Sequence, residues 1–294
     1  MPPTPRIALV TCQKLPELSP DDQVLQAALR RLGAHAEGMV WDDPNVDWAG
    51  FDVAVVRSTW DYHLRLDDFR AWIDARERDG SRVQNHPAVL RWNAEKTYLA
   101  ELERRGVPVV PTAWVPQGSS LGLGDVADIS GWNDIVVKPI VSASAHGTWR
   151  ASAPFDGETE HRFRDELRTR SLMVQPMLRE VAEHGELSLM FIGGRFSHAV
   201  RKLPRAGDFR VQREHGGSAT LVEPEAEIVR AAARALASSP APTLYARVDG
   251  CDVNGRFLLM ELELLEPSLF FTCSPAAATD FAREILLQLG GNST

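Results

Sequence analysis

The first 88 residues alternate short apolar runs with stretches of helical periodicity. Residues 7–10 and 51–56 are apolar runs of strand length, while 19–32 starts with Ser-Pro-Asp-Asp and continues with apolar positions at helical spacing. A second helix is predicted over 66–78. Because strands that alternate with helices are typical of a parallel sheet, residues 1–88 are predicted to form an N-terminal α/β domain for the substrate.

The middle of the chain, 89–178, predicts a second and smaller lobe. A helix is expected at about 94–105. Two short apolar runs, 135–139 and 172–176, have the length of strands and flank a polar helix over 157–170. This lobe is predicted to be a central subdomain between the two ends of the chain.

The pattern changes again over 179–294, where strands follow one another more closely. Two apolar runs within 187–200 flank Gly193-Gly194, which predicts a hairpin, and 243–248 and 257–265 predict two further strands. The remaining predicted elements are helices at 223–237 and 276–289. The chain is therefore predicted to be an α/β protein with α+β lobes: a parallel N-terminal domain, a small central lobe and a C-terminal lobe with an antiparallel sheet.

Composition and charge exclude several classes of protein. Hydrophobic residues make up 44% and charged residues 24% of the 294, which is typical of a globular protein. With 32 Lys and Arg against 40 Asp and Glu, the net charge is −8, so neither nucleic acid nor an anionic membrane is expected as a partner. Three widely spaced cysteines predict a reduced, cytoplasmic protein, and either a monomer or a homodimer is compatible with this composition.

Several familiar motifs are missing or misplaced. Residues 118–122 match G-x-S-x-G, but they lie in a stretch rich in Pro, Gly and Ser, which favours a loop over a nucleophile elbow. The eight histidines include no H-E-x-x-H, and the sequence has neither a G-x-G-x-x-G after its first strand nor a Walker A motif. A serine hydrolase, a zinc enzyme and a dinucleotide-binding enzyme are therefore not favoured.

Two predicted strands near the C-terminal end carry charged residues in apolar surroundings. Arg247 and Asp249 flank one apolar residue, and Glu261 and Glu263 flank another, so in each strand the pair points to one face. If the strands pair, the four side chains converge on one surface. Carboxylates of this kind are preferred ligands of Mg²⁺, often together with phosphate oxygens, although a solvent-facing row at a sheet edge has the same pattern.

Four separated cations accompany this acidic row. Lys96 is predicted on a helix, Lys138 and Lys202 end apolar strands, and Arg210 follows Gly-Asp-Phe. Each alone is typical of a protein surface, but together they suit a polyphosphate, whose charge needs neutralising from several directions. The small polar loop 142–148 could bring backbone N–H groups onto phosphates, or could be a plain surface turn.

The order of these motifs resembles the ATP-grasp superfamily of carboxylate-amine ligases, and is similar to glutathione synthetase and D-alanine–D-alanine ligase. The resemblance covers about the last 200 residues and includes an apolar Gln-Pro-Met-Leu segment followed by Gly-Glu. It implies ATP and two Mg²⁺ ions, or Mn²⁺, as cofactors. One departure is that many relatives carry Glu-x-Asn where this chain has Glu261 and Glu263.

The resemblance also implies a role for individual residues. The ATP-binding residues it implies are Lys96, Lys138, Ser144, Gly147, Gln175, Pro176, Met177, Leu178, Glu186 and Lys202. The catalytic residues it implies are Arg247, Lys202 and Arg210, the metal ligands are Asp249, Glu261 and Glu263, and Gly216-Gly217 would belong to a closing loop. The implied reaction transfers the γ-phosphate to a substrate carboxylate, and a nitrogen nucleophile then attacks the acyl phosphate.

A substrate site is predicted directly after the strand at 51–56, because ligands of open α/β sheets lie at the carboxyl ends of strands. The candidate substrate-binding residues are Arg57, Ser58, Trp60, Asp61 and Tyr62. Arg57 could grip a carboxylate bidentately, and the alternative is a helix-capping turn in which Ser58 caps and Trp60 packs. The Arg-Ser-Thr-Trp-Asp-Tyr segment resembles that of the ATP-grasp cyclo-ligases of cycloserine biosynthesis, which would act on O-ureido-serine by internal ring closure.

The function expected is thus an ADP-forming carbon–nitrogen ligase for a small amino-acid-like molecule. Two alternatives remain at this point. One is a ligase that adds amino acids to a peptide or protein terminus, and the other is a non-catalytic ATP-binding module.

Overall fold

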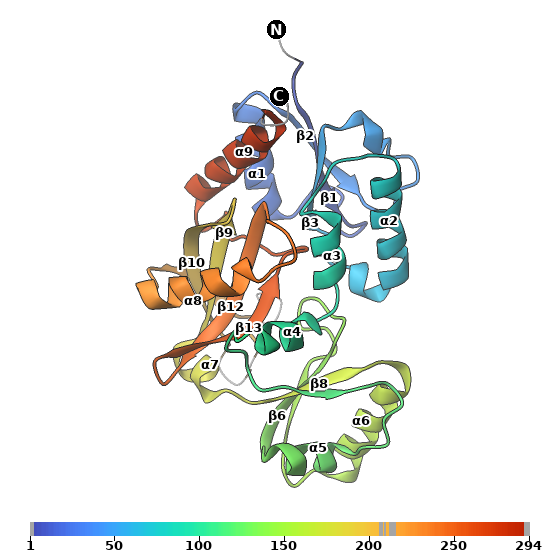
Figure 1. Cartoon of the computed structure of the whole chain (residues 1–294), viewed down its shortest axis with the longest axis vertical. Helices are drawn as coiled ribbons and strands as arrows, with labels where there is room; N and C mark the ends of the chain where they lie inside the picture. Colours follow the sequence, from blue (N-terminus) through green and yellow to red (C-terminus); the bar gives the residue numbers. More distant parts are fainter. Residues whose placement is uncertain (1–2, 206–207, 209, 212–215, 291–294) are drawn as a thin grey trace.

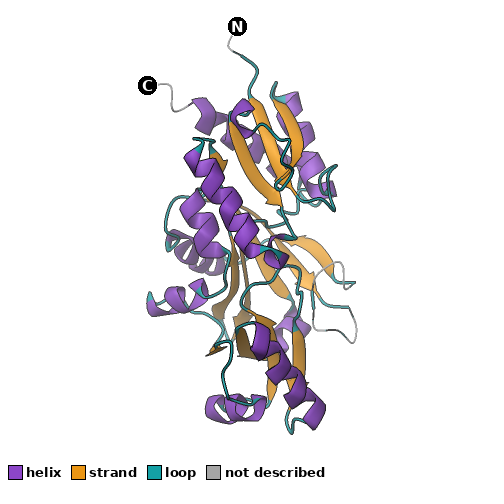
Figure 2. Ribbon diagram, turned by 90° about the vertical axis from the view of Figure 1, so that its right-hand side faces the viewer, coloured by secondary structure: helices purple, strands orange, loops and turns teal. Residues whose placement is uncertain are grey.

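The chain folds around three sheets stacked along its long axis (Figures 1 and 2). The computed structural model describes residues 3–205, 208, 210–211 and 216–290. Figure 1 shows the N-terminal sheet at one end, the five-stranded sheet in the middle and a small lobe at the other end. The predicted α/β class, with a parallel N-terminal sheet and an antiparallel C-terminal sheet, is confirmed. The predicted boundaries at 88 and 178 stay a prediction.

The N-terminal sheet is parallel, in the order β2-β1-β3-β4. Its strands are β1 (Arg6–Thr11), β2 (His35–Val40), β3 (Val53–Ser58) and β4 (Val83–Gln84). The helices of this region are α1 (Pro20–Arg31), α2 (Leu66–Arg78) and the short 3₁₀ turns η1 (Trp48–Gly50) and η2 (Tyr62–Leu64). Helix α1 begins as predicted, because the Ser19 hydroxyl accepts a hydrogen bond from the Asp22 amide at 3.1 Å. Strand β2 was not predicted, because its sequence begins with His-Ala-Glu-Gly and has no apolar run. Such a sequence is compatible with its position at the edge of the sheet.

The central lobe is an antiparallel sheet in the order β5-β8-β6-β7, covered by two helices. Its strands are β5 (Ala113–Val115), β6 (Asp134–Pro139), β7 (Trp149–Ser152) and β8 (Leu172–Pro176). The helices are α5 (Leu123–Ser130) and α6 (Gly157–Thr169). Phe163 of α6 packs with Ile135, Val137 and Val174, so the apolar face of each strand finds its cover within the lobe. The G-x-S-x-G segment lies between β5 and α5 as a loop, as predicted.

The helix predicted at 94–105 is confirmed over α4 (Tyr98–Arg104), but its start is wrong. The preceding residues form a separate helix, α3 (Pro87–Asn93), and Lys96 lies in the turn between the two rather than on a helix. The cause is tertiary. The Asn93 side chain pairs with the backbone of Leu262 and Leu264, each at 2.7 Å, and the Lys96 amide donates to the Ile140 carbonyl at 2.8 Å.

The C-terminal sheet is antiparallel, in the order β11-β10-β9-β12-β13. Its strands are β9 (Glu186–Ile192), β10 (Arg195–Leu203), β11 (Ser218–Val222), β12 (Tyr245–Val253) and β13 (Arg256–Glu263). The helices are α7 (Arg179–His184), α8 (Ala226–Ala237) and α9 (Pro275–Gly290). The predicted hairpin is confirmed: Gly193 and Gly194 have φ values of 55° and 73°, the left-handed conformation that a tight turn of this kind requires.

Helix α9 leaves the C-terminal sheet and packs beside α1 (Figure 1). Phe281 and Ile285 of α9 share one core with Leu25 and Leu29 of α1. The last segment of the chain therefore joins the C-terminal sheet to the N-terminal lobe. Among the described residues, no helix combines the length and the apolar character that crossing a membrane requires.

Candidate active site

A cavity of about 420 Å³ is lined by residues of all three lobes. This volume lies within the range of about 300–1,000 Å³ that is typical of small-molecule sites. The residues named from the sequence that line it are Trp60, Tyr62, Lys96, Lys138, Ser144, Gln175, Pro176, Met177, Leu178, Glu186, Lys202, Arg210, Arg247, Asp249, Glu261 and Glu263. Motifs scattered over some 200 residues of sequence therefore face one space.

The convergence of the acidic row is confirmed by the register of two neighbouring strands. β12 and β13 are antiparallel, with Arg247 opposite Glu263 and Asp249 opposite Glu261. Their alternation places these four side chains on the face that lines the cavity. The alternative of a solvent-facing row is wrong for Asp249, which is only 3% exposed.

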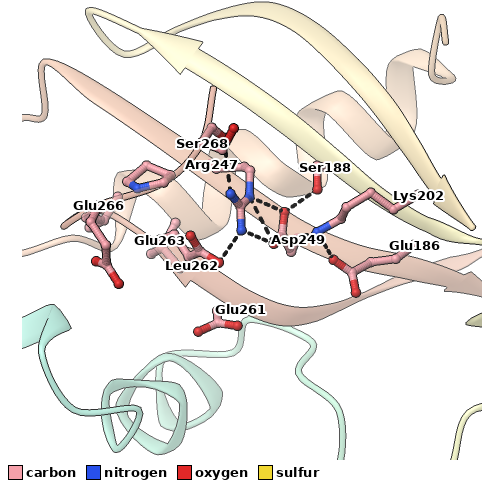
Figure 3. Close-up of polar contacts among 12 residues, drawn as sticks. Glu186, Ser188, Lys202, Arg247, Asp249, Glu261, Leu262, Glu263, Glu266 and Ser268 are labelled. Atoms are coloured by element: carbon pink, nitrogen blue, oxygen red, sulfur yellow. Dashed lines mark hydrogen bonds and ion pairs between the residues drawn. The ribbon is translucent and has the colours of Figure 1, made fainter. Parts of the chain in front are cut away.

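Asp249 lies at the centre of a network of buried ion pairs (Figure 3). The Arg247 guanidinium contacts both of its carboxylate oxygens at 2.9–3.0 Å, and the Lys202 ammonium lies 3.2 Å from one of them. The Ser188 hydroxyl donates to the other at 2.5 Å. Arg247 also pairs with Glu263, and Lys202 also pairs with Glu186. The two cations thus hold three carboxylates in place.

A second ion pair crosses from the turn between α3 and α4 to β13. The Lys96 ammonium lies 2.7 Å from the Glu261 carboxylate and donates to the Ser142 carbonyl at 2.8 Å. Burial opposes the charge of Lys96, but Glu261 outweighs it and raises the pKa of the lysine. Lys96 therefore stays charged and ties the loop 142–148 to the acidic row.

The acidic side chains of the site differ in their tendency to ionise. Burial raises the pKa of Asp249, but Arg247 and Lys202 outweigh it and hold that pKa below its usual range. Burial raises the pKa of Glu263 to about 8, because the attraction of Arg247 is offset by repulsion from Glu261 and Asp249. The site therefore combines firmly ionised and easily protonated carboxyl groups within a few residues.

The donor chemistry of Asp249, Glu261 and Glu263 suits a hard divalent cation such as Mg²⁺, which prefers oxygen ligands. In the structure each of the three is already paired with Lys96, Lys202 or Arg247. Within the described ranges, no three His, Cys, Asp or Glu side chains are grouped closely enough to hold a metal ion. The metal ligands named from the sequence therefore stay a prediction.

The predicted adenine contacts and one predicted phosphate contact, Lys138, lie on the central lobe. Lys138 donates to the Gln175 side chain at 2.9 Å, and its burial lowers its pKa. In the Gln-Pro-Met-Leu segment, the proline has no N–H and the Met177 amide donates to the Asp134 carbonyl at 2.9 Å. The amide of Leu178 is left as the backbone donor at this edge of the cavity.

The loop 142–148 contains two successive residues with left-handed backbone. Ser144 and Ala145, which line the cavity, have φ values of 50° and 55°. Such conformations are unfavourable for residues with a Cβ atom and concentrate at ligand sites. Gly147 is not among the residues lining the cavity, so its predicted contact with ATP is not supported. A Cβ there would lie 2.9 Å from Pro139, which explains the glycine by packing.

The predicted substrate residues divide into two groups. Trp60 and Tyr62 line the cavity, whereas Arg57, Ser58 and Asp61 do not. Arg57 is only 1% exposed. Its guanidinium pairs with Asp22 at 2.9 Å and donates to the Pro267 carbonyl at 2.8 Å.

The prediction that Arg57 grips a substrate carboxylate is therefore wrong, because its charge is already neutralised inside the protein. Ser58 lies 3.0 Å from the Thr11 hydroxyl, and Asp61 accepts from Trp41 at 2.9 Å and pairs with Arg65. These contacts place both side chains in the packing of the N-terminal lobe.

Other residues on the same side of the cavity were not found from the sequence. They are Ser19, Pro20, Asp21, Glu266, Ser268 and Thr272. Asp21 was interpreted only as an early acid of a helix, but its carboxylate accepts from the amides of Leu269 and Thr272, each at 3.0 Å. The one local signal for this group was Glu266-Pro267, because a charged residue at 266 interrupts the apolar stretch that follows Glu263.

The predicted Gly-Asp-Phe-Arg motif is described only in part. Arg210 lines the cavity and binds Asp208 through two nitrogens, at 2.8 and 3.1 Å. Gly207 and Phe209 lie outside the described residues, as do residues 212–215 that precede the predicted Gly216-Gly217. Gly216 lies beside the Arg205 side chain.

The sequence and the fold resemble known ligases over nearly their whole length. The model of the N-terminal domain of D-cycloserine synthetase DcsG matches residues 7–85. The cycloserine biosynthesis protein DcsG of Streptomyces lavendulae is 32% identical, over 96% of this chain and 98% of that protein. The crystal structure of D-cycloserine synthetase DcsG superposes with a TM-score of 0.85 at 30% identity, covering 97% of this chain and 99% of the other.

A more distant likeness shows the fold alone. The D-alanine–D-alanine ligase from Bacillus anthracis, in a crystal structure with ATP, has a TM-score of 0.71 at 15% identity and covers 97% of both chains. The three lobes around a cavity lined by charged residues, together with these similarities, identify the chain as an ATP-grasp ligase. Such an enzyme uses ATP to join carbon to nitrogen. Within that class, the chain belongs to the family of the D-cycloserine synthetase DcsG. A non-catalytic ATP-binding module is therefore no longer an alternative.

Proposed function

We propose that this ligase activates the carboxylate of a small amino-acid-like molecule as an acyl phosphate and closes a ring through a nitrogen of the same molecule. The main support is the full-length similarity to a cycloserine synthetase together with the arrangement of the cavity. Lys138 and the Gln-Pro-Met-Leu segment belong to the central lobe, and Trp60 and Tyr62 follow β3 of the N-terminal lobe. A nucleotide at the first end and a small substrate at the second would meet at the acidic row.

At the nucleotide end, the adenine would rest on the segment 175–178 and receive a hydrogen bond from the Leu178 amide. Glu186 would accept from a ribose hydroxyl while it keeps its ion pair with Lys202. Lys138, Lys202 and Arg210 would neutralise the triphosphate. Because Lys96 already contacts both Glu261 and the loop 142–148, phosphate binding there would also draw the loop over the nucleotide.

In the metal site, Glu261, Glu263 and Asp249 would hold the divalent cation, with two Mg²⁺ ions as the full complement. The bound cation would neutralise the charge of the phosphates. The lysines that now balance these carboxylates would then turn to phosphate oxygens, which keeps the buried charges paired throughout.

The reaction consists of two displacements. A carboxylate oxygen of the substrate attacks the γ-phosphorus, the bond to the β-phosphate oxygen breaks, and ADP leaves. The substrate nitrogen then attacks the acyl carbon, the C–O bond to phosphate breaks, and phosphate leaves as the nitrogen loses its proton. Arg247 would stabilise the negative charge of both transition states. Exclusion of water by the closed cavity would protect the acyl phosphate from hydrolysis.

The decisive experiment incubates the enzyme with ATP, Mg²⁺ and O-ureido-serine of either configuration, without another amine. We expect ADP, phosphate and a ring-closed product in equal amounts, measured by chromatography and mass spectrometry. ADP formation only after addition of a separate amine or peptide would refute ring closure in favour of intermolecular ligation. AMP and pyrophosphate would refute the acyl phosphate itself.

A further inference from the structure

The cavity is lined by six acidic side chains, and five of them are engaged within the protein. The six are Asp21, Glu186, Asp249, Glu261, Glu263 and Glu266. Asp21 accepts from two backbone amides, and the next four in the sequence are paired with Lys96, Lys202 or Arg247. Within the part of the chain that the structure describes, Glu266 is the one whose carboxylate is bound by no side chain and by no backbone amide of another residue. In Figure 3 it lies beside the network of Arg247 and Asp249, and no contact joins it to that network.

The backbone that carries Glu266 is held with unusual completeness. Six successive carbonyl oxygens, 264–269, each lie within 3.1 Å of a side-chain donor. For the carbonyls of residues 264 to 269, taken in that order, the donors are Asn85, Tyr245, Trp60, Arg57, Arg247 and His198. The Trp60 indole N–H donates to the carbonyl of Glu266 itself, at 3.0 Å. Glu266 thus presents a carboxylate that no other residue binds, on a backbone fixed at every carbonyl, and such a group is suited to bind a ligand.

The position of Glu266 matches the second charged group of an amino acid. It follows the metal row of β13 by three residues, on the side where Trp60 and Tyr62 line the cavity. A substrate whose carboxylate lies at the acidic row has its α-ammonium two bonds away from the carboxylate carbon. An ammonium ion there needs a carboxylate, and aromatic faces next to it add a cation–π attraction.

We propose that Glu266 binds the α-ammonium group of the substrate and thereby selects amino acids, with Trp60 as the positioning residue that fixes its backbone. This inference rests on the proposed function, because it takes the substrate to be an amino-acid-like carboxylate. It also explains why Arg57 and Trp60 occur together in one motif. Both side chains hold the segment that presents Glu266, although only the second lines the cavity.

The electrostatics of the cavity agree with this role. The pKa of Glu266 is raised to about 7, chiefly by burial. The charge of Lys96 lowers this pKa, and repulsion from Glu261 raises it. A cation that binds beside Glu266 would lower the pKa, since an opposite charge favours the ionised form of the carboxyl group.

The test compares wild type and Glu266→Gln with two substrates, O-ureido-serine and its analogue with hydrogen in place of the α-amino group. For wild type, loss of the amino group should lower kcat/KM by about 10-fold to 100-fold, the loss typical of a hydrogen bond between charged groups. Glu266→Gln should lower kcat/KM for O-ureido-serine by a similar factor and leave the analogue unaffected. The KM for ATP should stay within about twofold, and Glu103→Gln, an exposed change on α4, should alter nothing.

Two further measurements separate this proposal from a structural role and from the proposed function. Trp60→Phe keeps the ring but removes the indole donor, so it should raise the KM for O-ureido-serine and add little to the effect of Glu266→Gln. Binding of both compounds is also measured by calorimetry with a non-hydrolysable ATP analogue. Equal discrimination by wild type and Glu266→Gln would refute the role of Glu266 alone. A wild-type enzyme that neither binds nor turns over either compound would refute the proposed function as well.

Discussion

Replacement of Arg57 by methionine should destabilise the fold, because its guanidinium serves the protein and not the substrate. The side chain is 1% exposed and its partner Asp22 is 2% exposed, with 2.9 Å between Nε and Oδ1. Methionine has a similar reach but no charge, so the variant leaves a carboxylate buried without its cation. Removal of one partner of a buried pair typically costs about 3–5 kcal/mol.

That cost should be visible in thermal unfolding. At about 2 °C per kcal/mol for a chain of this size, the Tm should fall by about 6–10 °C. Arg78→Met, an exposed arginine at the end of α2, is the matched control and should change the stability by less than about 0.5 kcal/mol. In combination with Asp22→Asn, the loss should be smaller than the sum of the two single losses, because the unpaired charge is gone.

The assay pairs calorimetric unfolding with steady-state kinetics on the same preparations. A normal Tm with a selectively raised KM for the carboxylate substrate would refute this reasoning and restore Arg57 as a substrate ligand. Additive losses in the double variant would show that the two side chains do not form a coupled pair.

Three other predictions follow from the site. Glu261→Gln should lower kcat/KM by about 100-fold or more and shift the Mg²⁺ titration to higher concentration, and near-normal turnover at low Mg²⁺ would remove this residue from the metal site. Gly185→Ala should lower the free energy of unfolding in urea by about 1–3 kcal/mol more than Gly194→Ala. Both glycines have positive φ, but only at Gly185 would a Cβ atom lie 2.7 Å from a backbone oxygen, and equal losses of stability would contradict this clash. With a pKa of about 7, Glu266 is neutral at lower pH and ionised above, so kcat/KM for O-ureido-serine should rise by up to about tenfold from pH 6 to pH 8 in wild type. The same profile should be flatter in Glu266→Gln, and identical profiles would exclude this carboxyl group as their origin.

The acidic row shows how far periodicity alone can lead. Side chains two apart in a strand share a face whatever the surrounding fold, so the spacing by itself groups Arg247 and Asp249 with Glu261 and Glu263. The strand after Gly193-Gly194 followed from turn chemistry in the same way. The edge strand β2 and the break between α3 and α4 did not, since each depends on what lies beside it rather than on its own residues.

Arg57 marks the limit of such reasoning. From its neighbours in sequence it is a cation at the end of a strand, where a ligand is expected. Its actual partners are Asp22, 35 residues earlier, and the carbonyl of Pro267, 210 residues later. Nothing within the local segment distinguishes a guanidinium that is free to bind a substrate from one that already forms an ion pair inside the protein.

By itself the sequence determined the alternating strands and helices at the start of the chain, the antiparallel sheet of its last third and the set of charged residues that could serve ATP and a carboxylate. These follow from local periodicity and from the residue types that phosphate and Mg²⁺ chemistry requires. Only the tertiary structure decided which charges are paired with one another and that Glu266, among the described acidic residues of the cavity, forms no ion pair. The reason is physical: the free energy of a buried charge depends on groups a few ångströms away, and the fold brings those groups from distant parts of the chain.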